Sequence, residues 1–170
     1  MFDLLVKNGT VVDGTGAPRF RGDVAVQGDR IVAVGLVSGT ARETIDADGC
    51  IVTPGFVDIH THYDGQVSWD QILAPSSING VTSAAMGNCG VGFAPARADK
   101  HDWLIQLLEG VEDIPGTALA EGLTWNWESF PDYLNALSER EYTIDLGAHM
   151  PHAALRAYVM GDRGGDHLAR

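Results

Sequence analysis

The chain has 170 residues, and its 11 Lys and Arg against 23 Asp and Glu give a formal net charge of −12. Hydrophobic residues make up 45% of the sequence, which excludes an intrinsically disordered protein. Basic residues do not cluster and no apolar run approaches the roughly 18 residues of a membrane span, so we expect neither nucleic acid nor a membrane as a partner. Because the start of the chain lacks the pattern of a signal peptide, we expect a cytoplasmic location.

Residues 1–50 consist of runs rich in β-branched residues, separated by turn-forming Asp-Gly and Gly-Asp pairs. This pattern predicts a small antiparallel sheet. The composition changes after Pro54, where a Pro-Gly pair interrupts the chain. We therefore place a boundary between a first unit, residues 1–54, and a second unit, residues 55–170.

In the second unit, predicted strands alternate with predicted helices. In chain order they are a strand in GFVDIHTH, a strand in INGVTSAAM, a helix at about 99–111, a short helix after Pro131, a strand at 143–150 and a helix in HAALRAYVMG. We expect both the first and the last of these strands to be buried. The alternation predicts an α/β fold with a parallel sheet, whose functional groups gather at the carboxyl ends of the strands.

His60 and His62 close the first of these strands. Side chains two apart on a strand point to the same face and lie about 6.6 Å apart along it, so both imidazoles can reach one metal ion at about 2.0–2.1 Å. The alternative is a pair of histidines in a solvated loop. Asp64 follows the pair and is placed to accept a hydrogen bond from an imidazole and so orient it.

Cys89 lies in the segment GNCG, at the end of the next predicted strand. The flanking glycines let the backbone bend and let a ligand approach closely, and a thiolate is a soft ligand suited to Zn²⁺. A second interpretation stays open from the residues alone, in which Cys89 is a small buried hydrophobic residue. His149 and His152 flank the end of the third strand, and for them we expect structural or substrate-positioning roles rather than metal ligation.

The segments GFVDIHTHYDGQ and GVTSAAMGNCGVGFAP resemble the N-acyl-D-amino-acid deacylases, or D-aminoacylases, of the amidohydrolase superfamily. The resemblance continues through FDLLVKNGTVVDGTG at the start and the AHMPHAALRAYVMG region. It implies a zinc hydrolase with a (β/α)₈ TIM-type barrel and a small β-sandwich built from both chain ends. Residues 1–54 would then be the N-terminal part of the sandwich and residues 55–170 the first part of the barrel.

The resemblance also implies roles for particular residues. The cysteine that matches Cys89 is a ligand of a tightly held Zn²⁺, together with two histidines from later strands. The pair that matches His60 and His62 borders a second, weaker metal position, and a later aspartate is the general acid/base. The implied substrate is an N-acyl-D-amino acid, which is cleaved to the D-amino acid and a carboxylate.

A (β/α)₈ barrel needs about 250 residues, so 170 residues hold only part of this architecture. We therefore expect an incomplete barrel that is inactive alone, with the remaining ligands and the catalytic aspartate beyond the end of this chain. Two other functions stay open. One is a cyclic-amide hydrolase of the dihydroorotase or hydantoinase type, against which the GNCG cysteine argues. The other is a non-catalytic assembly module that pairs with another chain through open sheet edges.

Overall fold

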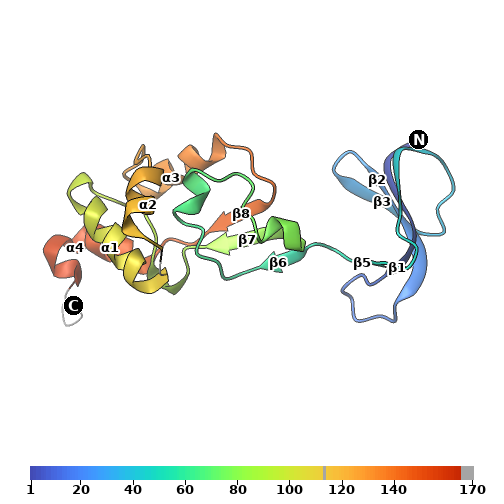
Figure 1. The fold of residues 1–170 in the computed structure, drawn as a ribbon, viewed down its shortest axis with the longest axis horizontal. Helices are drawn as coiled ribbons and strands as arrows, with labels where there is room; N and C mark the ends of the chain where they lie inside the picture. Colours follow the sequence, from blue (N-terminus) through green and yellow to red (C-terminus); the bar gives the residue numbers. More distant parts are fainter. Residues whose placement is uncertain (113, 166–170) are drawn as a thin grey trace. The chain divides into compact units, whose positions relative to one another are not determined.

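The computed structural model describes residues 1–112 and 114–165, which form two compact units (Figure 1). The first unit is Met1–Pro54, and the second begins at Gly55. Among the described residues, no helix has both the length and the apolar character that crossing a bilayer demands.

The first unit is a five-stranded sheet. Its strands are β1 (Phe2–Val11), β2 (Phe20–Gln27), β3 (Arg30–Gly35), β4 (Ala41–Asp46) and β5 (Ile51–Val52). Strands β1, β2 and β3 are antiparallel, whereas β4 and β5 both pair with β1 in parallel. The prediction of a wholly antiparallel sheet was therefore wrong. Turn residues predict where the chain changes direction, but they do not predict which free edge the next strand joins.

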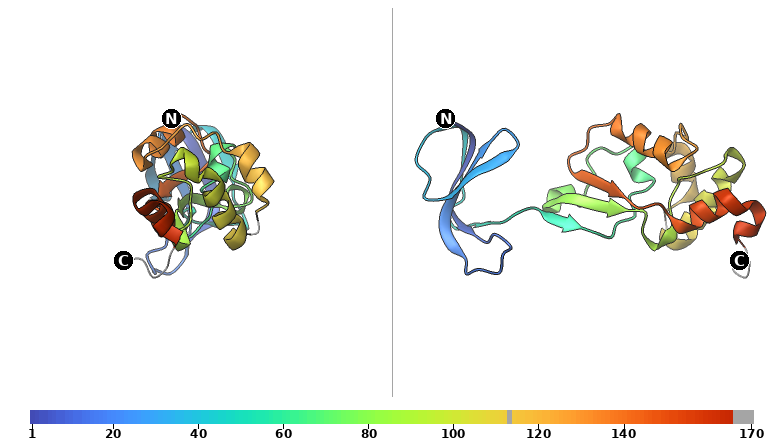
Figure 2. Two further views of the ribbon diagram at one scale, coloured as in Figure 1. Left: turned by 90° about the vertical axis from the view of Figure 1, so that its left-hand side faces the viewer. Right: turned by 180° about the vertical axis from the view of Figure 1, so that it is seen from behind.

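The second unit contains a three-stranded parallel sheet of order β6-β7-β8, as the alternating pattern predicted. Its strands and helices are β6 (Phe56–Asp58), β7 (Val81–Met86), α1 (His101–Glu112), α2 (Gly116–Gly122), α3 (Phe130–Ser138), β8 (Asp145–Ala148) and α4 (His152–Met160). Single turns of 3-10 helix lie at Gln66–Ser68, Ser77–Asn79, Asn88–Gly90, Ala98–Lys100 and Gly161–Gly165. Helices α1, α2 and α4 gather beyond the carboxyl ends of the strands (Figure 2). The sequence analysis missed α2.

Strand β6 is exposed, which contradicts the prediction of a buried strand. Phe56 is 62% exposed, Val57 is 66% exposed, and Ile59 just beyond the strand is 74% exposed. Strand β6 lies at the edge of the sheet, and no layer of the described residues covers these side chains. Strand β8 is only partly buried, so the expectation of burial was wrong there too. An apolar run predicts a strand suited to burial, but it does not supply the layer that buries it.

The core of the second unit lies between the helices and the loops after β6 and β7. Tyr133 of α3 is 2% exposed, and its hydroxyl donates to the backbone carbonyl of Asp64 over 2.8 Å. The indole N–H of Trp127 donates to the carbonyl of Phe93, also over 2.8 Å. The first of these bonds ties the loop after β6 to α3, and the second ties the loop after β7 to the segment that leads into α3.

Replacing Tyr133 by Phe should lower the free energy of unfolding by about 1–3 kcal/mol, because it removes a buried hydrogen bond to the Asp64 carbonyl. Urea denaturation of the chain measures this loss. The matched control is Tyr158→Phe, whose hydroxyl bonds to the exposed Glu128 and whose loss should be smaller. Equal losses in the two variants would show that burial adds nothing to the Tyr133 bond.

Candidate metal centre

The carboxyl ends of β6, β7 and β8 lie side by side. Asp58 pairs with Ala84, and Met86 at the end of β7 pairs with Ala148 of β8. Parallel strands direct their carboxyl ends to one edge of a sheet, so the loops that follow them meet there. All of the site residues predicted from the sequence lie in these loops or at the first residue of α4.

The structure brings His60, His62 and Cys89 together, but β6 ends at Asp58, so the prediction that the two histidines close the strand was wrong and both lie in the loop after it. One ligand atom from each lies within 4.8 Å of the other two. The closest pair is His60 Nε2 and Cys89 Sγ, which are 3.2 Å apart, and the two imidazole rings have centroids 5.4 Å apart. His60 and Cys89 are exposed and His62 is half-buried, so the group faces solvent. The alternative that Cys89 is a buried hydrophobic residue is excluded.

A left-handed turn presents Cys89 to the histidines. Gly87, Cys89 and Gly90 have φ values of +83°, +53° and +79°, a region that glycine adopts freely and other residues rarely. A Cβ atom on Gly87 would overlap the carbonyl oxygen of His149, so that position also requires glycine for space. These conformations explain why glycines flank the cysteine.

Asp64 is buried, with 3% of its surface exposed. Its Oδ2 accepts the backbone N–H of Gly87 over 3.1 Å, so it links the loop after β6 to the loop after β7. Burial of the Tyr133 phenol, with the negative charge of Asp64 nearby, raises the pKa of Tyr133 well above its usual value. The role of Asp64 in orienting an imidazole stays a prediction.

His152 begins α4 beside the cysteine turn. His152 is exposed, and its Cβ would lie 3.6 Å from a Cβ atom built on Gly90. Within the described residues it is not part of the group formed by the three candidate ligands. His149 is also exposed, and its backbone N–H donates to the carbonyl of Met86 over 2.8 Å.

Two polar residues that the sequence analysis did not single out connect the loops of the site. Thr61 lies between the two histidines, and Asn88 precedes Cys89. A signal for Thr61 was available: a residue between two that share one face of an extended chain points to the opposite face. For Asn88 the sequence offers only its place in a glycine-rich turn.

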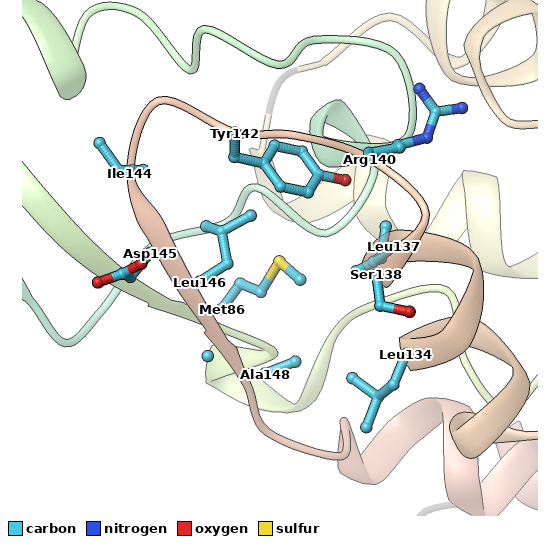
Figure 3. Close-up of a pocket in the computed structure, with 11 residues that line it drawn as sticks. Met86, Leu134, Leu137, Ser138, Arg140, Tyr142, Ile144, Asp145, Leu146 and Ala148 are labelled. Atoms are coloured by element: carbon cyan, nitrogen blue, oxygen red, sulfur yellow. The ribbon is translucent and has the colours of Figure 1, made fainter. Parts of the chain in front are cut away.

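A pocket of about 300 Å³ lies elsewhere, between α3 and β8 (Figure 3). It is lined by Met86, Leu134, Leu137, Ser138, Arg140, Tyr142, Ile144, Asp145, Leu146, Gly147 and Ala148. None of the three candidate ligands lines it. The pocket and the candidate metal centre are therefore separate features of the second unit.

Comparisons with known proteins identify relatives of this chain. It is 38% identical to a D-aminoacylase from Alcaligenes xylosoxydans xylosoxydans, over 95% of this chain and 31% of the relative. A solved D-aminoacylase with a binuclear metal centre aligns with a TM-score of 0.79 and 38% identity, covering 95% of this chain and 32% of that one. An N-acyl-D-glutamate deacylase from Bordetella bronchiseptica, solved with zinc and a phosphonate that mimics the tetrahedral intermediate, aligns with a TM-score of 0.72 and 32% identity over the same shares.

The chain thus spans about a third of the length of these relatives. The sequence profile of the Amidohydrolase family matches residues 43–169, a range that contains all three candidate ligands. With most of its length matched in this way, the chain belongs to the amidohydrolase family.

Proposed function

We propose that this chain supplies metal-binding groups of a zinc-dependent amide hydrolase that acts on N-acyl-D-amino acids. The observation that carries the proposal is the convergence of His60, His62 and Cys89 within 4.8 Å. The similarity to a D-aminoacylase and an N-acyl-D-glutamate deacylase supports the reaction and the substrate class.

The three side chains fit Zn²⁺ chemically. Zinc binds imidazole nitrogen at about 2.0–2.1 Å and thiolate sulfur at about 2.3 Å in a tetrahedral arrangement, which places neighbouring ligand atoms about 3.3–3.6 Å apart. The His60 and Cys89 atoms, 3.2 Å apart, already lie near that spacing. The resemblance to deacylases suggests a division of this group, with Cys89 at a tightly held ion and the two histidines bordering a second, weaker position.

If His60, His62 and Cys89 hold a zinc ion, it would act as a Lewis acid toward an amide carbonyl and would lower the pKa of a bound water toward about 7. The exposed faces of His60 and Cys89 leave room for a substrate to approach. We propose that His152, which is exposed beside the cysteine turn, hydrogen-bonds a substrate. Asp64, which is buried, holds the two loops together and is a positioning residue in this proposal.

Hydrolysis also needs a group that carries a proton to the leaving nitrogen. Asp58 and Asp64, the carboxylates closest in sequence to the histidines, already accept backbone N–H groups, from His60 and Gly87 respectively. We propose that the general acid/base is an aspartate in another segment of the enzyme, as in the deacylases that the sequence resembles.

The fold around this site is, in our proposal, part of a (β/α)₈ barrel. Strands β6, β7 and β8 would be its first three strands, and residues 1–54 would be the N-terminal part of a β-sandwich. Among the described residues, β6 and β8 each have one edge without a partner strand, which supports this because a closed barrel leaves no free edge. A cytoplasmic location is part of the same proposal.

A non-catalytic assembly module is the second candidate function. The observation that favours it is the exposed apolar surface of Phe56, Val57 and Ile59 on and beside the edge strand β6. Such an edge offers both unpaired backbone groups and apolar area to a second chain.

The first prediction concerns metal binding. Cys89→Ser should weaken the affinity of the 170-residue chain for Zn²⁺ by at least about tenfold, because a thiolate ligand is replaced by a neutral hydroxyl. Competition with a chromophoric chelator measures the affinity. The matched control is Cys50→Ser, which removes the exposed cysteine of the first unit and should change nothing. Equal effects in the two variants would refute the assignment of Cys89 as a ligand.

The second prediction concerns the reaction. A chimaera in which this chain replaces the matching 31% of the Alcaligenes D-aminoacylase should release D-methionine from N-acetyl-D-methionine and leave the L enantiomer intact. Cys89→Ser in the chimaera should abolish this hydrolysis. The 170-residue chain alone should cleave neither enantiomer, because the proposed proton shuttle lies in another segment.

Gel filtration and circular dichroism must first show that the chimaera is a folded, non-aggregated protein. Hydrolysis of dihydroorotate in preference to the acyl amino acid would instead favour a cyclic-amide hydrolase. Cys89-dependent turnover by the isolated chain would show that the proton shuttle lies within these 170 residues.

The third prediction concerns the assembly module. Val57→Lys should reduce self-association of the chain in analytical ultracentrifugation, because it places a charge on the exposed edge strand. Its effect on stability should stay within about 0.5 kcal/mol, since the side chain is mostly solvent-exposed. The control is Val32→Lys, an exposed position on β3. Unchanged association in Val57→Lys would leave the module without a docking edge at β6.

A further inference from the structure

Where the site begins, side-chain hydrogen bonds supplement the backbone bonding between β7 and the loop after β6. The paired register of β6 and β7 ends at Asp58 and Ala84. Beyond it, the carbonyl oxygen of Ala85 accepts three hydrogen bonds. Two come from the backbone N–H and the hydroxyl of Thr61, each 2.9 Å long, and the third comes from Asn88 Nδ2 over 3.0 Å. The Ala85 carbonyl therefore accepts hydrogen bonds both from the loop after β6, through Thr61, and from the turn after β7, through Asn88.

Asn88 makes a second bond that crosses between the loops. Its Nδ2 also donates to the carbonyl of Thr61 over 3.2 Å. A carboxamide NH₂ group has two N–H donors, so one proton can serve each carbonyl. The partners also decide which way the amide faces, because its oxygen would repel the carbonyls of Thr61 and Ala85. The bridge therefore needs a side chain with two donors on one atom, which a carboxylate of the same shape lacks.

The bridge ends beside all three candidate ligands. Thr61 is 8% exposed and lies between His60 and His62, so fixing its backbone fixes both imidazole-bearing residues. Asn88 directly precedes Cys89, and its carbonyl accepts the N–H of the residue that closes the turn. Together with the Asp64 bond to Gly87, the Asn88 side chain thus ties the histidine loop to the cysteine turn.

We propose that Asn88 is a positioning residue of the metal centre, whose carboxamide sets the separation between the His60–His62 segment and Cys89 before the metal binds. The inference rests on the proposed metal site. Ligands held in place by surrounding hydrogen bonds lose less conformational entropy when a metal binds, and loss of such a supporting partner typically weakens metal affinity by about 10–100-fold.

The test compares two asparagines that flank β7, Asn88 after the strand and Asn79 before it. Asn88→Ala removes the two hydrogen bonds from Asn88 Nδ2 to the carbonyls of Thr61 and Ala85. Asn79→Ala removes one side-chain hydrogen bond, from Asn79 Nδ2 to the carbonyl of Pro75. Asn88→Ala should weaken Zn²⁺ affinity of the 170-residue chain about 10–100-fold, and Asn79→Ala should leave it unchanged. The ultraviolet thiolate band of the Cd²⁺ complex should persist in saturated Asn88→Ala, because Cys89 is still present. Affinities within about twofold of each other would overturn the proposal.

A metal-free measurement separates the bridge from the site it serves. In the metal-free chain, Asn88→Ala should speed amide hydrogen exchange at Thr61, and Asn79→Ala should not. Asn88→Asp keeps the shape but lacks the donors, so it should speed exchange as much as Asn88→Ala does. Unchanged exchange at Thr61 in either Asn88 variant would overturn the proposal.

The two hypotheses can fail separately. If Cys89→Ser leaves zinc affinity unchanged, the metal site itself is refuted. Exchange at Thr61 then decides alone whether Asn88 holds the two loops together. If Cys89→Ser weakens binding but Asn88→Ala does not, the metal site stands and the positioning role is refuted.

Discussion

The parallel pairing of β6 with β7 is the constraint on which the candidate site depends. His60 and Cys89 are 29 residues apart in sequence, and no local structure would bring them together. Because both strands run in the same direction, their carboxyl ends share one edge, and the loops that leave them start as neighbours. Because β6 and β7 pair over only a few residues, contacts between the loops are also needed to hold the site residues close together. Asp64 and Asn88 supply those contacts from opposite loops.

The turn that carries Cys89 illustrates how backbone strain can be held at a site. A non-glycine residue with a φ of +53° is disfavoured, and such residues persist only where the surroundings determine the conformation. Here the surroundings are specific: the N–H of Gly87 bonds to Asp64, and the turn closes from Val91 N–H to the Asn88 carbonyl. The buried carboxylate of Asp64 has a corresponding explanation, since an N–H donor offsets part of the cost of removing its charge from water.

Much of this arrangement could be predicted from the sequence, and the parts that could not share a physical cause. The glycines around Cys89 encode a local conformation, which is a property of a few adjacent residues. The alternation of strands and helices encodes a parallel sheet in the same way. The parallel position of β4 and the exposure of Phe56 depend instead on which other segment takes a free edge or covers a face. The strand predicted to carry His60 and His62 ends at Asp58, so their approach to Cys89 depends on contacts with another loop.

The Asn88 bridge likewise depends on which other segment lies nearby, and not on the adjacent residues alone. Asparagine in a glycine-rich turn ordinarily satisfies its own turn, and nothing in the segment GNCG specifies a bond to Thr61 in another loop. The same distinction separates the metal site from the rest of the proposed enzyme. The contacts that place the three candidate ligands lie within two neighbouring loops and α3, so this geometry can form within the second unit. In the barrel that we propose, a substrate pocket and a proton shuttle would need groups from further strands, because three parallel strands would occupy only one arc of it. The proposal therefore treats metal binding and turnover as separable properties.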